Sequence, residues 1–225
     1  KLKKSVVIAN EHNELKTKFI RNISSQMEPT LNTLGTSAKE LSAQAPRYAE
    51  QMQAQVAALK QFSDNIQELS SLENSLTEPY EMGEVNAGTF CENVMEKAKE
   101  FMKPNVTPSV NAPKLQVKTN KEQLERILLY LLKNAAFYTE QGRISLDFKK
   151  RGAHTHQFII TDTGTGISAE QQENLFKPFT QVKDLTTGDG LGLPICSLIA
   201  TKMNGSLTLD TGYTKGCRFI LELHA

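Results

Sequence analysis

The spacing of the apolar residues changes near residue 78, and this change limits the possible folds more than any other feature of the sequence. Before it, apolar residues recur every three or four positions in two stripes, which are Leu15, Phe19, Ile23, Met27, Leu31, Leu34, Ala38 and Leu41, and Met52, Val56, Leu59, Phe62, Ile66, Leu69, Leu72 and Leu76. Such spacing places each stripe on one face of a helix. Residues 44–47 interrupt the pattern, so we expect a helical hairpin over residues 1–78.

A hairpin with two narrow apolar stripes covers those stripes poorly by itself. Two such hairpins side by side would close a four-helix bundle, so we expect a homodimer formed through residues 1–78. The alternative is a monomer in which the hairpin packs on the C-terminal half of the same chain.

A different pattern follows a linker at residues 79–85. Ten of the thirteen glycines lie at or after residue 142, and residues 143–149 alternate apolar and polar side chains as a half-buried strand does. Residues 121–138 form a strong helical pattern, and short strand patterns lie at 114–119, 157–161, 206–210 and 218–223. These features predict an α+β chain in which residues 86–225 form an α/β sandwich.

The charge balance and the cysteines argue against several classes of protein. Lys and Arg number 26 and Asp and Glu number 25, so the basic excess that is typical of a nucleic-acid-binding protein is missing. The three cysteines are far apart and form no CxxC pair, which argues against a disulfide scaffold or a zinc site and favours a reducing, cytoplasmic location.

Two glycine-rich loops carry the chemistry. In the first, Asp162 follows a strand pattern and precedes Gly164 and Gly166, and the second loop, residues 188–193, opens a helical segment. Glycines let a ligand approach the backbone closely, and a carboxylate at a strand end can accept a hydrogen bond from an exocyclic amine. Successive N–H groups at a helix N-terminus bind phosphate. The two loops together therefore predict a nucleotide site.

Two other interpretations of the first loop are weaker. A Gly-x-Gly sequence after a strand is often a plain turn. Residues 164–169 also match the dinucleotide-binding fingerprint, but that fold needs a second strand that ends in an acidic residue about 20 residues later. Residues 180–189 are polar and show no strand pattern, so we reject the dinucleotide-binding fold. The sequence also holds no P-loop, so we reject the P-loop nucleotide-binding fold as well.

Four blocks in this order resemble the ATP-binding domain of sensor histidine kinases, within the superfamily that includes gyrase and MutL. Residues 124–139 resemble the N box, 162–167 the G1 box, 176–179 the F box and 188–193 the G2 box. The resemblance extends over about 85–225, and the preceding hairpin resembles the dimerisation and histidine-phosphotransfer domain of the same family.

The resemblance implies a site for ATP and Mg²⁺. Asp162 would accept a hydrogen bond from the adenine amine, and Asn134 would ligate Mg²⁺, which prefers oxygen ligands. The other implied site residues are Gly164 and Gly166 beside the base, Gly188, Gly190 and Gly192 at the phosphates, and Phe176 and Phe179 as anchors of a lid at about 180–189. Core packing is an alternative explanation for the two phenylalanines.

The phosphotransfer block departs from the family pattern. Residues 19–31 align with it without a gap, but the phosphoacceptor histidine falls on Ser25 and the neighbouring acidic residue falls on Gln26. A serine hydroxyl needs a base to become nucleophilic, and a glutamine side chain cannot act as one. We therefore predict that no catalytic pair is intact here and that the chain does not autophosphorylate at position 25. The four histidines, His12, His154, His156 and His224, are expected to be bystanders.

The N box also departs from the pattern, because Tyr130 and Phe137 stand where the family usually has an asparagine and a lysine. Both changes would remove polar contacts to a magnesium triphosphate, whereas the adenine contact through Asp162 is retained.

The family mechanism is ATP-dependent phosphorylation of a bundle histidine, followed by transfer to an aspartate of a response regulator. Two hypotheses remain for this chain. It phosphorylates a histidine of a partner kinase in trans, or it is a pseudokinase whose dimer relays a signal. In either case we expect the chain to be the cytoplasmic fragment of a larger sensor. The basic residues Lys1, Lys3 and Lys4 would suit attachment just inside a membrane. They equally suit a solvated helix end.

Overall fold

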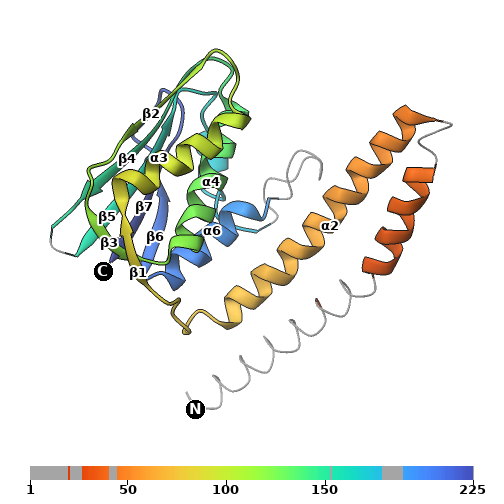
Figure 1. The fold of residues 1–225 in the computed structure, drawn as a ribbon, viewed down its shortest axis with the longest axis horizontal. Coiled ribbons are helices and arrows are strands. Elements are labelled where there is room, and N and C mark those ends of the chain that lie inside the picture. The colour runs from red at the N-terminus through yellow and green to blue at the C-terminus, as the bar shows by residue number, and fades with distance from the viewer. Residues whose placement is uncertain (1–19, 21–26, 41–44, 153, 179–189, 225) are drawn as a thin grey trace. The chain divides into compact units, whose positions relative to one another are not determined.

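The computed structural model describes residues 20, 27–40, 45–152, 154–178 and 190–224 (Figure 1). The chain divides into two compact units. A helical unit comprises Lys1–Ser75 with Lys177–Ile195, and a sheet unit comprises Leu76–Phe176 with Cys196–Ala225. The predicted boundaries at residues 78 and 86 stay predictions.

Between residues 27 and 75 the structure describes two helices of this unit, residues 27–40 and α2 (Pro46–Asn74). The second helix begins at Pro46, where the fixed backbone angle of proline suits a first helical turn. The helices touch at Gly35, because a Cβ added there would lie 3.7 Å from Cγ1 of Val56. Thus the helical periodicity of this half is confirmed for the described residues, while the homodimer and its four-helix bundle stay predictions.

The sheet unit contains a five-stranded sheet with the strand order β2-β4-β5-β7-β6 (Figure 1). Strand β2 pairs with β4 in parallel, and the other pairs are antiparallel. The bounds are Val106–Asn111 for β2, Gly142–Lys150 for β4, Thr155–Asp162 for β5, Gly205–Leu209 for β6 and Arg218–His224 for β7. A separate two-stranded sheet pairs β1 (Gly83–Asn86) with β3 (Gln116–Thr119). Strands β1 and β2 were not expected from the sequence.

Helices α3 (Ala87–Ala98) and α4 (Lys121–Tyr138) cover one face of the five-stranded sheet (Figure 1). A short 3-10 turn, Lys99–Phe101, follows α3, and the remaining helices are α5 (Ala169–Gln172) and α6 (Gly192–Lys202). The core lies between the helices and the sheet. Its largest fully buried side chains include Leu124, Ile127, Leu128, Leu131 and Leu132 of α4 and Ile144, Leu146, Phe158 and Ile160 of the sheet. The helix predicted over residues 121–138 is therefore confirmed, and its apolar face is the buried one.

Both ends of α4 are fixed by hydrogen bonds to other segments. At its start, Asn120 Oδ1 accepts a hydrogen bond from the N–H of Gln123 (2.9 Å), which caps the helix, while Nδ2 donates to the carbonyl of Glu81 (2.8 Å). At its end, the carbonyl of Tyr138 accepts a hydrogen bond from the N–H of Thr165 (3.2 Å). Helix α4 thus connects the segment before β1 to the loop after β5.

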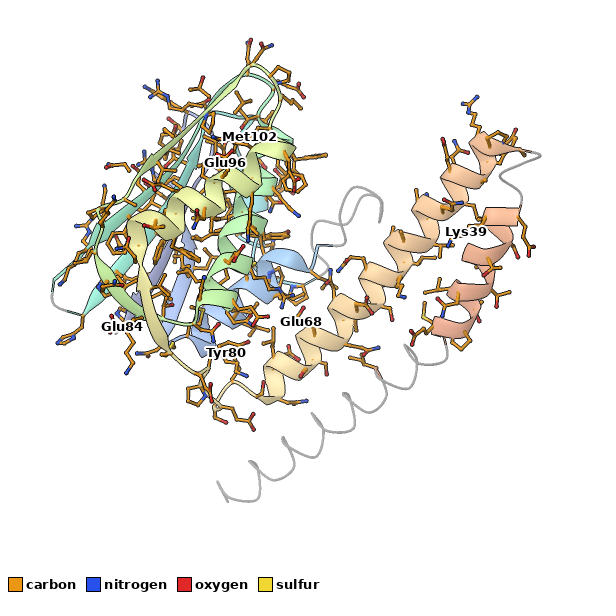
Figure 2. The ribbon with its side chains drawn as sticks, viewed as in Figure 1. Lys39, Glu68, Tyr80, Glu84, Glu96 and Met102 are labelled. Carbon is orange, nitrogen blue, oxygen red and sulfur yellow. The ribbon has the colours of Figure 1, made fainter. Side chains whose placement is uncertain are left out.

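The segment that enters β1 is also held by a side-chain contact. The ammonium of Lys202, at the end of α6, lies 4.5 Å from the centroid of the Tyr80 ring, and Tyr80 lies just before β1 (Figure 2). Residues 80–85, predicted as linker, therefore dock on the sheet unit. Among the described residues, no helix combines the length and apolar character that a membrane span needs.

We predict that Asn120→Ala lowers the free energy of unfolding by about 1–2 kcal/mol, because it removes both the helix cap and the hydrogen bond to Glu81. Urea denaturation followed by circular dichroism measures this. The matched control is Asn111→Ala at the exposed end of β2, for which we expect a change within about 0.5 kcal/mol. Equal effects of the two substitutions would contradict the double role of Asn120.

Candidate nucleotide site

The site is built around Asp162, the last residue of β5, whose side chain is only 3% exposed. Its Oδ1 accepts hydrogen bonds from the backbone N–H groups of Gly164 (2.9 Å) and Cys217 (3.1 Å). Burial raises the pKa of this carboxyl above its usual range, and the two N–H donors act in the opposite direction. Among the residues that the structure describes, both of these hydrogen bonds use Oδ1.

A backbone bond reinforces the same junction, since the N–H of Asp162 donates to the carbonyl of Cys217 (2.9 Å). Burial and the charge of Asp162 raise the pKa of the Cys217 thiol to about 12. The thiol is therefore neutral near pH 7 and lacks the reactivity of a thiolate. Thus Cys217 serves the site through its backbone and not as a nucleophile.

Gly216 leaves the space in which Asp162 lies. A Cβ on residue 216 would lie 2.2 Å from the carbonyl oxygen and 2.8 Å from Oδ1 of Asp162, and the φ angle of this glycine is +148°. Any side chain here would displace the carboxylate. Sequence reasoning missed Gly216, because its requirement comes from a contact with a distant residue and not from a local motif.

The two glycines of the loop after β5 are needed for different reasons. A Cβ on Gly164 would lie 2.4 Å from the carbonyl oxygen of Tyr138, so the loop can contact the end of α4 only without a side chain at this position. Gly166 has space around it but a φ of +73°, which favours glycine. The loop is thus both turned and fixed against α4.

A cavity of about 340 Å³ adjoins this loop. It lies between the loop and the connection from β6 to β7, and its lining includes Gly166, Ser168, Tyr213, Gly216 and Cys217. One wall is held in place by Arg218, whose guanidinium lies 4.2 Å from the ring centroid of Tyr213 and pairs with Asp210 (3.2 Å). The volume is in the range of small-molecule sites.

The partly open face of α4 lies next to the same loop. Asn134 is half-buried on this face, one helical turn before Tyr138. Phe137 and Tyr138 are 59% and 54% exposed, and their rings meet edge to face, with centroids 4.9 Å apart. The site thus has aromatic side chains at the end of α4.

The structure brings together Asp162, Gly164 and Gly166, and it places Asn134 on the helix that holds their loop. Phe176 is half-buried, Gly192 is the first residue of α6, and Gly190 lies two residues before that helix. Ser25, Gln26, Phe179 and Gly188 lie outside the described residues. The part of the chain that the structure describes contains no group of three His, Cys, Asp or Glu residues that could hold a metal ion. The functional roles of all these residues stay predictions.

Comparison with known proteins gives the family. The model of the histidine kinase-, DNA gyrase B- and HSP90-like ATPases matches residues 119–225. The chain is 25% identical over 224 residues to the aerobic respiration control sensor protein ArcB of Escherichia coli K12. This alignment covers 93% of this chain and 29% of ArcB. It is 27% identical over 218 residues to the sensor-like histidine kinase SenX3 of Mycolicibacterium smegmatis. That alignment covers 91% of this chain and 56% of SenX3.

A solved structure agrees in fold. Full-length ShkA in complex with AMPPNP matches with a TM-score of 0.74 at 21% identity, over 93% of this chain and 46% of ShkA. Residues 119–225, just under half of the chain, therefore match the domain of the histidine kinase-, DNA gyrase B- and HSP90-like ATPases, and the relatives that align with most of the chain include a sensor-like histidine kinase. The predicted family and the predicted α+β fold with an ATPase domain of this type are confirmed. The chain spans less than a third of ArcB and little more than half of SenX3.

We predict that Gly216→Ala lowers the free energy of unfolding by about 3 kcal/mol, because the new Cβ overlaps Asp162 in addition to straining the backbone. The matched control is Gly152→Ala, which also has a positive φ (+85°) but no atom within 4 Å of the added Cβ, and should cost only about 1 kcal/mol. Urea denaturation compares the two. A similar loss in both variants would mean that the contact with Asp162 is unimportant.

Proposed function

We propose that this chain is the nucleotide-binding and dimerisation core of a protein similar to the sensor histidine kinases, and that it binds ATP without phosphorylating its own hairpin. The observation that carries the proposal is the buried Asp162 carboxylate, which two backbone N–H groups hold through Oδ1. The ATPase family of residues 119–225 and the AMPPNP complex of ShkA support it.

The site fits the base of an adenine nucleotide. Oδ2 of Asp162 would accept a hydrogen bond from the exocyclic amine, and the glycines of the loop would let the ring approach the backbone. A base that carries a carbonyl at that position, as guanine does, would present an acceptor to another acceptor. Asp162 therefore favours adenine over guanine.

The phosphate side of the site has fewer polar groups. Asn134 offers one amide oxygen to Mg²⁺, so the remaining ligands of the ion would be phosphate oxygens and water. When bound, MgATP would supply a γ-phosphoryl group for transfer. Residues 188–192 would bind the phosphates through backbone N–H groups, whereas Tyr130 and Phe137 offer them no cation.

The hairpin sequence explains why phosphorylation of the chain itself is not proposed. Ser25 would need a base to become a nucleophile, and Gln26 provides none. The remaining roles are signal relay by a homodimer of the hairpin, with residues 79–85 joining it to residues 86–225, and phosphorylation of a histidine on a partner kinase that then serves a response regulator. The loss of polar groups at positions 130 and 137 favours the first role. We place the protein in the cytoplasm as part of a larger sensor.

We predict that isothermal titration of the chain with ATP and Mg²⁺ shows binding that Asp162→Asn weakens at least tenfold, roughly the effect of leaving one polar contact unmade. Asparagine keeps an oxygen for the two backbone donors but turns an amide N–H₂ toward the adenine amine. The matched control is Asp147→Asn on β4, which removes the same charge outside the site and should leave the affinity unchanged. Absence of binding at millimolar ATP would reject nucleotide binding and leave a scaffold.

We predict that the chain incubated with labelled ATP forms no acid-labile phosphohistidine, because Ser25 and Gln26 replace the nucleophile and its base. Addition of a partner hairpin that carries the family histidine separates the two roles. Labelling of the partner supports phosphorylation in trans, whereas no labelling supports the relay role. Stable phosphohistidine on this chain alone would contradict the proposal.

A further inference from the structure

The turn between β4 and β5 gathers cations at the end of the sheet opposite to Asp162. Residues 148–161 contain three Lys or Arg, two His and no Asp or Glu, so their formal charge with neutral His is +3, whereas that of the whole chain is +1. In the register of the two strands Lys150 pairs with His156, and Ile144 pairs with Asp162. Six residues of β5 separate the two pairs, which is about 20 Å at the rise of a strand. The turn is therefore remote from the candidate nucleotide site.

The three cations of this turn, Lys149, Lys150 and Arg151, are exposed. Within the described part of the chain none of the three forms an ion pair, and the Nε of Arg151 donates a hydrogen bond to the neutral side chain of Gln157 (3.2 Å). Burial lowers the pKa of His156, and the charge of Lys150 lowers it further. The turn thus presents a cluster of positive charge to its surroundings.

The carboxylates at the adjacent strand positions are held by other groups. Glu222 of β7 accepts a hydrogen bond from Nε2 of Gln157 (2.6 Å) and lies 3.6 Å from Nε2 of His224. Asp147 of β4 accepts a hydrogen bond from the hydroxyl of Ser145 (2.8 Å). These contacts keep both carboxylates on the strands, so the cations of the turn are available to an anionic partner.

The backbone of the turn projects from the end of the sheet. The N–H of Arg151 donates to the carbonyl of Thr155 (2.7 Å), and a Cβ added at Gly152 would have no atom within 4 Å. Successive side chains of a strand point to opposite faces, so Lys149 and Lys150 lie on the two sides of the turn. Its described residues expose no Leu, Ile, Val, Phe or Tyr side chain. The turn is therefore a cationic tip without an apolar anchor.

We infer that the turn between β4 and β5 is a contact site for an anionic lipid surface. An anionic bilayer attracts Lys and Arg side chains without requiring a complementary shape. Protein interfaces, in contrast, depend on anchors that fill pockets, and the basic excess typical of a nucleic-acid-binding protein is missing from this chain. Because Asp162 lies at the other end of β5, contact with lipid is compatible with nucleotide binding. The inference does not depend on the proposed function.

The test is cosedimentation of the whole chain with vesicles made of equal parts of phosphatidylglycerol and phosphatidylcholine, beside vesicles of phosphatidylcholine alone. At an ionic strength of about 0.02 M we expect the wild type to bind the anionic vesicles and not the neutral ones, and at about 0.5 M we expect release, because salt screens the attraction. The triple variant Lys149→Gln, Lys150→Gln and Arg151→Gln should bind at least about tenfold more weakly, because each cation near an anionic surface contributes roughly fivefold.

The matched control is the triple variant Lys97→Gln, Lys99→Gln and Lys103→Gln. It removes the same charge from the sheet unit, but each of these lysines already pairs with a glutamate. We expect its affinity for the anionic vesicles to stay within about twofold of the wild type. Unchanged unfolding midpoints would show that both triple variants fold.

Three results overturn the inference. The first is a wild type that does not bind the anionic vesicles, and the second is an equal loss of binding in the two triple variants. The third is binding that the substitutions in the turn leave unchanged, which would assign the contact to other cations such as Lys1, Lys3 and Lys4. A wild type that binds polyglutamate or a DNA duplex but no vesicle belongs to the first case and would assign the turn to an acidic protein or to nucleic acid.

Discussion

The site depends on a carboxylate that is held inside the protein by two backbone N–H groups. Through Oδ1, Asp162 joins the end of β5 to the loop that follows it and to the residue before β7. Burial raises the pKa of this carboxyl, and the two N–H donors act in the opposite direction because they stabilise the ionised form. The glycine at 216 follows from the same constraint, since only a residue without a side chain leaves room for the carboxylate. The core of the sheet unit thus fixes the position of the Asp162 carboxylate.

In the proposed function, recognition of the base and transfer of the phosphoryl group would depend on separate parts of this chain. The proposed base contact comes from the sheet unit, where backbone hydrogen bonds join Asp162 to Cys217 and the loop after β5 to the end of α4. The chemistry of transfer would depend on the helical hairpin and on polar groups of α4. At Ser25, Gln26, Tyr130 and Phe137 the resemblance to the family implies other residues. A protein can lose the second function and keep the first, because neither the strands nor the glycine loop involves these positions.

Local patterns could be predicted from the sequence, and contacts between distant segments could not. The buried face of α4 follows from helical spacing, and the loop after β5 follows from an aspartate and two glycines in one short stretch. Strand β2 was missed because it carries Pro108 at the edge of the sheet, where a missing N–H is tolerated, and because its partner β4 lies far along the chain. Strand β1 was assigned to the linker because four residues show no clear alternation. The roles of Gly216 and Cys217 depend on their contact with Asp162, which no local pattern reveals.

The two hydrogen bonds of the Asn120 side chain fix the length of the chain that leads into the sheet unit. One amide caps α4 and also holds the carbonyl of Glu81, and five residues later Asn86 is already paired with Gln116. Residues inserted before Tyr80 leave this joint unchanged. Residues inserted between Glu81 and Gly83 have to bulge outward, or else the hydrogen bond from Asn120 or the pairing of β1 with β3 has to break. The joint therefore tolerates variation in length on its hairpin side and resists it on its sheet side.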